Sequence, residues 1–214
     1  MEEKTDVKKA LVITGGFCNT KGLGWLSPEG YCCIIAADSG LRTAKRLGIR
    51  PGIIVGDFDS LGRIPGKGKE EKGAEIIVLP CEKDVTDTMF ACGRAADLGC
   101  RDITIIGGTG GRVDHTISNV FFLEHLRDQG IRAVICDGSN TVRFAEDETV
   151  EIEGGGGYFS VFSVDRCTVT AEGCRYPLRN HELSRNDPYA VSNEVEGEKA
   201  YVSVRGKAII VTSR

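Results

Sequence analysis

The sequence lacks the features that mark several common classes of protein. No apolar run approaches the roughly 20 residues that a membrane-spanning helix needs, so we expect no membrane association. Lys and Arg number 27 against 31 Asp and Glu, and the net charge of −4 argues against a nucleic-acid-binding protein, which usually carries a basic face. Residues 1–9 are charged and contain no apolar h-region, so we expect no secretory signal and a cytoplasmic protein.

The nine cysteines also lack a familiar pattern. No two of them have CxxC spacing, which argues against a zinc ribbon or a thioredoxin-type motif. Several lie inside apolar runs, as Cys32, Cys33 and Cys136 do. We interpret them as small buried hydrophobic residues with free thiols.

Three nucleotide-binding signatures are missing as well. The chain has no GxxxxGK[ST] loop, which excludes a Walker A NTPase. Neither Thr14-Gly15-Gly16-Phe17 nor the glycine-rich segment at 107–111 fits GxGxxG in a first βα unit, so a dinucleotide oxidoreductase is disfavoured. The lysine strand, HRD and DFG motifs of protein kinases are absent too.

What the first half contains is a regular alternation of short apolar runs and helix-like stretches. The runs are β-branched and nearly continuous, as in strands that are buried on both faces. This rhythm predicts a mostly parallel sheet in an α/β domain. The expected strands are Ala10–Thr14, Cys32–Ala36, Gly52–Val55, Glu75–Leu79, Asp102–Ile106 and Arg132–Cys136. The expected helices are Ser39–Leu47, Asp84–Leu98 and Asp114–Asp128.

Two of these helices show an apolar face by spacing. Val85, Met89, Cys92 and Ala96 recur at helical intervals, and Ile117, Val120, Phe121 and Leu126 form a second stripe. Between the third and fourth strands, the segment Lys67–Gly73 is charged, and we expect a solvated surface loop there.

From about residue 139 the helical pattern stops. Alternating or β-branched segments separated by Gly, Asn and Asp predict an all-β domain. We expect domain boundaries of 1–138 and 139–214, and the segment from Val202 to Ile209 resembles a terminal hairpin. The expected strands are Thr141–Phe144, Thr149–Glu153, Tyr158–Val164, Thr168–Ala171, Ala200–Arg205 and Ala208–Thr212.

Acidic residues follow four of the expected strands of the first half. In an open α/β sheet, ligands bind beyond the carboxyl ends of the strands. Each acid taken alone fits a helix cap, but as a set they would repel one another unless a cation lay among them. We expect Asp84 and Asp87 to share one side of the first turn of a helix. Mg²⁺ suits such a site, because it prefers hard oxygen ligands and bridges to phosphates. The acids are Asp38, Asp57, Asp59, Asp84, Asp87 and Asp114.

Two cations and a glycine-rich turn accompany these acids. Lys83 and Arg112 could neutralise a polyphosphate, the lysine as a point charge and the arginine as a bidentate fork. The glycines at 107, 108, 110 and 111 would let backbone N–H groups approach a phosphate before a helix, although such turns also arise from packing. His115 could orient a phosphate, act as a base, or simply bond to backbone at a helix start.

These residues resemble the ordered motifs of the thiamine pyrophosphokinase family, and the likeness covers nearly the whole chain. GDFDS followed by KDxTD and GRxDHxxxN is far more specific in this order than any one motif alone. The segments that carry it are Ala37-Asp38-Ser39-Gly40, Gly56-Asp57-Phe58-Asp59-Ser60, Lys83-Asp84-Val85-Thr86-Asp87, Gly111-Arg112-Val113-Asp114-His115 with Asn119, Gly173-Cys174-Arg175-Tyr176-Pro177-Leu178, and Val191-Ser192-Asn193-Glu194.

The resemblance implies a parallel-sheet α/β/α catalytic domain, a C-terminal β-sandwich that binds thiamine, and a homodimer with its active sites between subunits. The implied reaction converts ATP and thiamine to AMP and thiamine diphosphate. The resemblance implies that Asp57, Asp59 and Asp87 hold Mg²⁺ with Asp38 and Asp84 nearby, that Lys83, Arg112 and Asp114 lie at the nucleotide phosphates with Gly110, His115 and Asn119 beside them, and that Ser192 and Asn193 seat thiamine.

Two other functions stay open at this point. A related pyrophosphokinase could act on another primary alcohol, such as a hydroxymethylpterin, with different contacts around Ser192 and Asn193. Alternatively, the chain could be a non-catalytic module that binds a nucleotide or thiamine. The complete acid set together with Lys83 and Arg112 disfavours this last function.

Overall fold

The computed structural model describes residues 7–66 and 71–214. Residues 1–6 of the charged N-terminal segment lie outside this description, as does most of the expected loop Lys67–Gly73. The chain divides into two compact units, the first ending at Gly138 and the second running from Ser139 to Arg214. No helix of the described residues is long and apolar enough to cross a membrane.

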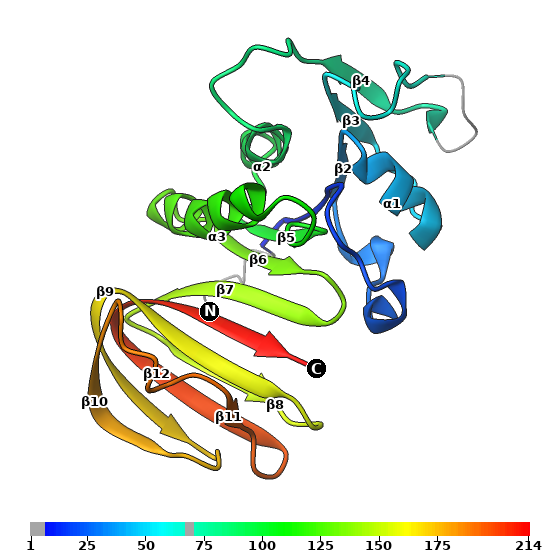
Figure 1. Cartoon of the computed structure of the whole chain (residues 1–214). Helices are drawn as coiled ribbons and strands as arrows, with labels where there is room; N and C mark the ends of the chain where they lie inside the picture. Colours follow the sequence, from blue (N-terminus) through cyan, green and yellow to red (C-terminus); the bar gives the residue numbers. More distant parts are fainter. Residues whose placement is uncertain (1–6, 67–70) are drawn as a thin grey trace, which may run out of the picture. The chain divides into compact units, whose positions relative to one another are not determined.

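The first unit is a parallel sheet with helices on both faces (Figure 1). The strand order is β6-β5-β1-β2-β3-β4, and every neighbouring pair is parallel. The helix α1 lies on one face, and α2 and α3 lie on the other. The expected α/β/α architecture is therefore confirmed. The elements are β1 (Lys9–Ile13), η1 (Thr20–Leu23), η2 (Pro28–Gly30), β2 (Cys33–Ala37), α1 (Gly40–Leu47), β3 (Ile53–Gly56), β4 (Glu75–Val78), α2 (Asp87–Asp97), β5 (Asp102–Ile106), α3 (Val113–Asp128) and β6 (Arg132–Cys136).

The central strands are buried because both of their faces are covered. Leu11, Val12 and Ile13 of β1 are fully buried, as are Ile103 and Ile105 of β5. Each such side chain contributes about 1.5–3 kcal/mol of apolar transfer free energy relative to an exposed position. At the edge of the sheet, β4 is only partly buried, so the expectation of strands buried on both faces does not hold there.

The helices differ from the sequence expectation in where they begin and which face they bury. The helix α2 begins at Asp87, because the Thr86 side chain caps it, and its buried face is Ala91, Cys92 and Ala95. Val85 precedes the helix and is exposed. The expected stripe on α3 is also partly wrong, because Ile117 and Phe121 are exposed. The buried residues of α3 are Asn119, Leu123 and Leu126.

The second unit is built on two long antiparallel strands, β9 and β12, which pair along most of their length. One half of this ribbon pairs with β7 and β11, and the other half pairs with β8 and β10. The pairing therefore makes two sheets that share β9 and β12, with a common core that includes Phe159, Val169 and Val202. This is the expected β-sandwich. The strands are β7 (Asn140–Glu146), β8 (Thr149–Glu153), β9 (Tyr158–Glu172), β10 (Leu178–Ser184), β11 (Asn193–Glu194) and β12 (Lys199–Ser213).

The expected terminal hairpin is wrong. Residues 199–213 form one continuous strand, β12, with a bulge in its pairing between Gly206 and Ala208. A bulge bends and twists a strand without reversing it. The glycine at 206 has φ of 94°, so the residue that suggested a turn marks the bend between the two sheets. The two strands expected within Tyr158–Ala171 are likewise one strand, β9.

Candidate active site

The strand order of the first unit reverses at β1, whose neighbours are β2 on one side and β5 on the other. At such a reversal the loops that leave two adjacent strands diverge and open a crevice beyond their carboxyl ends. A pocket of about 250 Å³ lies there. Its walls come from the loops after β1, β2 and β5 and from the first turns of α2 and α3.

Close backbone packing shapes the floor of this pocket. Gly16 N donates a hydrogen bond to Gly107 O at 2.9 Å, and Thr14 N donates one to Ile106 O at 2.8 Å. A Cβ on Gly16 would lie 2.2 Å from Gly107 O, so no side chain fits between the two loops. Thr14, Gly15 and Gly16 line the pocket. Sequence reasoning missed them, because their partner loop is distant in the chain, with 93 residues between Thr14 and Gly107.

The glycine-rich turn after β5 has two roles. A Cβ on Gly110 would lie 2.4 Å from the Phe17 side chain, so Gly110 is required for packing as well as lining the pocket. Gly111 has φ of 68° and open space around its Cβ position. The sequence left open whether these glycines serve packing or ligand access. In the structure Gly110 is required for packing, and both Gly110 and Gly111 line the pocket.

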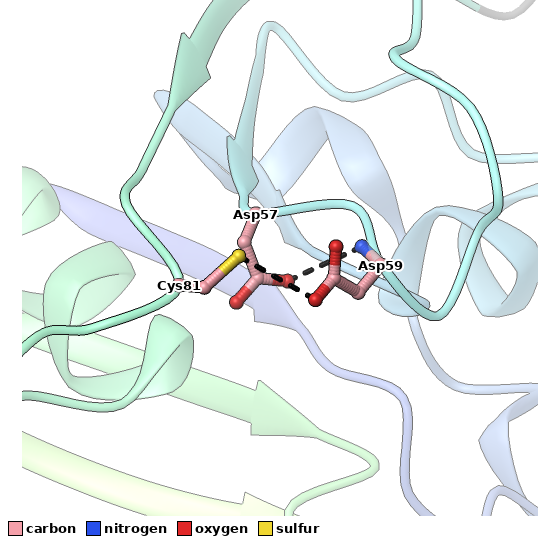
Figure 2. Close-up of side chains that lie close together, drawn as sticks. All are labelled: Asp57, Asp59 and Cys81. Atoms are coloured by element: carbon pink, nitrogen blue, oxygen red, sulfur yellow. Dashed lines mark hydrogen bonds between the residues drawn. The ribbon is translucent and has the colours of Figure 1, made fainter.

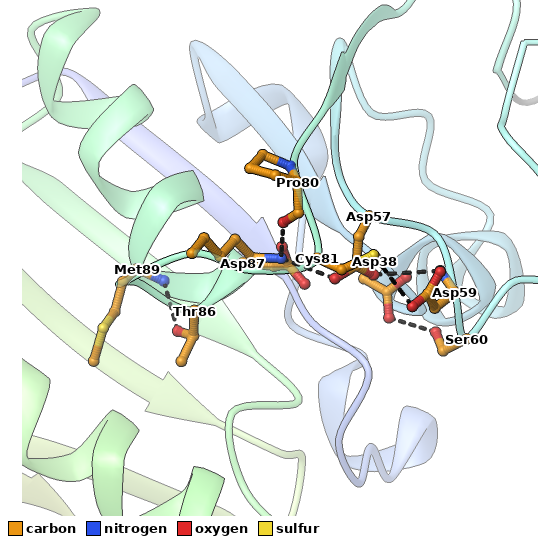
Figure 3. Close-up of polar contacts among 10 residues, drawn as sticks. Asp38, Asp57, Asp59, Ser60, Pro80, Cys81, Thr86, Asp87 and Met89 are labelled. Atoms are coloured by element: carbon orange, nitrogen blue, oxygen red, sulfur yellow. Dashed lines mark hydrogen bonds and ion pairs between the residues drawn. The ribbon is translucent and has the colours of Figure 1, made fainter.

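Beside the pocket, side chains from three loops meet through polar contacts (Figure 3). Lys83 Nζ lies 2.9 Å from Asp57 Oδ2 and 3.0 Å from Asp87 Oδ1, and it donates a hydrogen bond to Pro80 O at 3.2 Å. The three side chains are 14–22% exposed. The ammonium therefore neutralises two carboxylates in a partly desolvated place.

The pKa values of these groups follow from the same contacts. The hydrogen bond from Lys83 holds the pKa of Asp57 below its usual value. Burial raises the pKa of Asp87, and the Lys83 ammonium offsets this only in part. Partial burial of Lys83 favours its neutral form, but the two carboxylates outweigh this effect and raise its pKa, so Lys83 stays charged.

Asp38 and Asp59 extend the acidic cluster. Asp38 has φ of 47°, a left-handed conformation, at the end of β2. Its Oδ2 accepts a hydrogen bond from the Ser60 hydroxyl, and its buried Oδ1 has no hydrogen-bond partner among the described residues. Asp59 N donates to Asp57 Oδ1 at 3.3 Å, across the buried Phe58, whose φ is 64°. This turn brings Asp57 and Asp59 together.

Cys81 lies close to both Asp57 and Asp59. Cys81 Sγ donates to Asp59 Oδ2 at 3.5 Å, and one ligand atom each of Asp57, Asp59 and Cys81 lies within 4.8 Å of the others (Figure 2). Within the described residues, neither Asp84 nor Asp87 belongs to this group. Sequence reasoning treated the cysteines as buried hydrophobic residues, so it missed Cys81, whose exposure follows from its place in a loop after the edge strand β4.

The expectation for Asp84 is wrong in its geometry. Because α2 begins at Asp87, Asp84 lies before the helix and does not share its first turn. Asp84 is exposed and makes no polar contact within residues 7–66 and 71–214. The residue that pairs with Asp87 is Lys83, four residues before it.

At the start of α3, Arg112 and Asp114 form an exposed ion pair. Arg112 Nε donates to Asp114 Oδ1 at 3.1 Å, and the guanidinium lowers the pKa of Asp114. His115 N also donates to Asp114 Oδ1, at 3.0 Å. Buried Asn119 donates through Nδ2 to Gly108 O at 2.8 Å, which ties the glycine turn to the helix. Arg112, His115 and Asn119 line the pocket.

Comparison with known proteins decides the family. The family model described as the thiamin pyrophosphokinase catalytic domain matches residues 29–135, and that of the thiamin pyrophosphokinase vitamin B1 binding domain matches residues 139–209. This chain belongs to the thiamin pyrophosphokinase family.

Members of the thiamin pyrophosphokinase family resemble this chain in both sequence and structure. Thiamine pyrophosphokinase of Bacillus subtilis (strain 168) is 29% identical over 184 residues, which cover 84% of this chain and 86% of that protein. A crystal structure of thiamine pyrophosphokinase from Bacillus subtilis matches with a TM-score of 0.82 and 25% identity, covering 96% of this chain and 99% of the other. A thiamin pyrophosphokinase from Geobacillus thermodenitrificans matches with a TM-score of 0.78 and 26% identity, covering 96% and 97%.

The remaining motif of the thiamin pyrophosphokinase family lies in the second unit. Asn193 is 4% exposed, and its Nδ2 donates to Tyr176 O at 2.7 Å while its Oδ1 accepts from Tyr176 N at 3.0 Å. Both ends of the amide thus hold the turn before β10. Ser192 is exposed with φ of 61°, and its backbone N donates to Ser160 Oγ at 3.0 Å. Asn193 therefore holds the backbone of the turn in place, whereas the neighbouring Ser192 faces solvent.

Proposed function

We propose that this protein transfers the diphosphoryl group of ATP to the hydroxyl of thiamine, with thiamine diphosphate and AMP as products. The observation that carries the proposal is the pairing of Lys83 with Asp57 and Asp87, with Asp38 and Asp59 close by, beside a glycine-walled pocket at the reversal of the sheet. The reaction forms a bond from the thiamine oxygen to the β-phosphorus and breaks the bond from that phosphorus to the oxygen of AMP.

The acidic cluster fits the Mg²⁺ that such a reaction uses. Its donors are hard carboxylate oxygens, which Mg²⁺ prefers, and the buried Asp38 Oδ1 has no hydrogen-bond partner among the described residues. We assign Asp57, Asp59 and Asp87 as the metal-holding residues, with Asp38 beside them and Asp84 as an outer acid. Held by these residues, Mg²⁺ would neutralise charge on the phosphate oxygens of the nucleotide.

The other residues of the site orient the nucleotide. Lys83 offers a compact positive charge that stays ionised, because carboxylates raise its pKa. Arg112 offers a planar guanidinium for bidentate contact with a phosphate at the rim of the pocket. The backbone N–H groups in the first turn of α3 would face a phosphate, and the residues assigned beside it are Gly110, Asp114, His115 and Asn119. Holding the phosphates in line with the attacking oxygen supplies most of the catalysis in phosphoryl transfer.

The thiamine hydroxyl must lose its proton during the transfer, and Asp59 or Asp87 accepts it in our proposal. We assign the thiamine subsite to the second unit, with Ser192 as a contact and Asn193 as the residue that holds its loop. We also propose that the protein works as a homodimer, with active sites between subunits. The nine free thiols suit a reducing compartment, which supports a cytoplasmic location.

The test is release of AMP from ATP and Mg²⁺ in the presence and absence of thiamine. We expect AMP and thiamine diphosphate to form in equal amounts when thiamine is present and neither to form without it. AMP release with a hydroxymethylpterin but not with thiamine would assign the protein to another pyrophosphokinase activity. Binding of ATP without any AMP release would leave a non-catalytic module.

A further inference from the structure

Two cysteines meet at the amino ends of the strands of the first sheet, which is the end opposite the candidate active site. Cys32 directly precedes β2 and Cys100 lies shortly before β5, so both lie at the amino ends of parallel strands whose carboxyl ends carry the pocket. The strand β1 lies between β2 and β5. The sulfur atoms of Cys32 and Cys100 are 3.6 Å apart.

The two thiols differ in their access to solvent. Cys32 is exposed, and with Lys8 and Cys33 it lines an open cavity of about 340 Å³. Cys100 is fully buried. A reagent can therefore reach Cys32 directly, whereas the sulfur of Cys32 lies in contact with the buried thiol of Cys100.

We propose that Cys32 and Cys100 form a reversible disulfide when the protein meets a low-molecular-weight disulfide. An exposed thiol with a second thiol beside it to resolve the mixed disulfide is an arrangement that such chemistry uses. Lys8 at the cavity would attract an anionic oxidant such as glutathione disulfide. The pair is separated by 68 residues in sequence, so no spacing motif reveals it.

The reaction proceeds in two exchanges that balance. The Cys32 thiolate attacks one sulfur of the small disulfide, forms a mixed disulfide and releases one thiol. The Cys100 thiol then attacks Cys32 Sγ, forms the protein disulfide and releases the second thiol, which takes the proton from Cys100. The protein loses two electrons and two protons, and the small disulfide gains them.

Two consequences follow from the surroundings of the pair. Burial raises the pKa of the Cys100 thiol to about 12, so only a small fraction of Cys100 is thiolate at neutral pH. The sulfurs must approach to about 2.05 Å, and the segments before β2 and β5 have to move to allow this. Once formed, the bond would close a long loop and tie together the strands on both sides of β1, which stabilises the folded state.

The experiment treats the full-length protein with glutathione disulfide and maps tryptic peptides before and after reduction with dithiothreitol. Peptide Ala95–Arg101 carries Cys100, and peptide Gly22–Arg42 carries Cys32 and Cys33. We expect these two peptides to be joined, with loss of two hydrogens, and to separate on reduction. The melting temperature of the oxidised protein should rise by about 5–10 °C, since disulfides that close long loops stabilise proteins of this size to that extent.

Three variants make the test specific. The joined peptide and the rise in melting temperature should disappear in Cys32→Ser and in Cys100→Ala, and both should persist in the matched control Cys33→Ser. Cys32 is exposed, so Cys32→Ser is expected to fold normally even if the buried Cys100→Ala does not. A joined peptide that persists in Cys32→Ser, or a glutathione adduct that stays on Cys32 with no link to Cys100, would overturn the proposal.

Discussion

Among single residues, Lys83 is the one whose contacts join the acidic loops. Its ammonium lies between a carboxylate from the loop after β3 and one from the start of α2. In water such pairs contribute little, but these side chains are mostly buried, and removing the cation leaves two negative charges facing each other. Lys83 therefore holds the acidic cluster together, and in our proposal it also supplies charge for a phosphate.

We predict that Lys83→Met lowers kcat for AMP release by at least about 100-fold, because a preorganised charge at the reacting phosphates is lost. Lys83→Arg should recover only part of the rate, since a planar fork does not replace a compact point charge. Steady-state kinetics with circular dichroism as the folding control measures both effects. A Lys83→Met protein with unchanged kcat would remove Lys83 from the catalytic machinery.

Asp57 is the acid most tightly bound into the cluster, so its loss should be severe. We predict that Asp57→Asn abolishes turnover while the fold is retained, because one hard anionic ligand disappears without a change in side-chain volume. Asp165→Asn is the matched control: Asp165 lies in β9, is exposed and makes no polar contact within the described residues. Equal AMP release by the wild type and Asp57→Asn would refute the metal assignment.

The lowered pKa of Asp57 predicts a pH dependence of the stability of the metal-free protein, which Asp57→Asn should lack. The pKa of Asp57 is lowered below 3.8 in the folded state, so the unfolded chain binds a proton more readily. The stabilising contribution is therefore present above pH 3.8 and is lost as pH falls through the folded pKa. The melting temperature of the wild type minus that of Asp57→Asn should shrink toward zero below that pH. If this difference in melting temperature grew on acidification, the pKa of Asp57 would be raised rather than lowered in the folded state, and the prediction would be wrong.

Among the elements, α2 is positioned by its cap. The Thr86 hydroxyl accepts a hydrogen bond from Met89 N at 3.2 Å, which makes Asp87 the first helical residue and directs it toward Lys83. We predict that Thr86→Ala costs about 1 kcal/mol and lowers the melting temperature by about 2–4 °C, with a fall in kcat because Asp87 loses its fixed place. Thr86→Ser should restore both quantities. If Thr86→Ala lost stability but kept its kcat, the cap would stabilise the helix without positioning Asp87 for catalysis.

Elements with a clear local signal could be predicted from the sequence, and others could not. The strands β5 and β6 have the predicted bounds, because apolar β-branched runs stop sharply at polar residues. The strand β12 was mistaken for a hairpin, because a glycine at a bulge and a glycine in a turn look alike without the partner strand. The strand β10 was missed, since polar residues such as His181 and Glu182 alternate there with few apolar ones.

For the whole molecule, the proposal of a homodimer gives a direct prediction. Light scattering behind size-exclusion chromatography should report a mass twice that of one chain at micromolar concentration. If the active sites lie between subunits, activity per chain should fall on dilution below the dimer dissociation constant. A monomeric protein with full activity per chain would contradict this part of the proposal.

The sequence by itself determined the fold class, the change of rhythm near residue 139 and the set of acids, because local periodicity and short motifs encode these features. Only the tertiary structure decided which groups meet. Lys83 between Asp57 and Asp87, Cys81 beside Asp59, and Thr14 to Gly16 against Gly107 depend on strand order and on where α2 begins. Lys83 and Asp87 are only four residues apart, but the other contacts join loops far apart in the chain, and no local pattern specifies the register that brings those loops together.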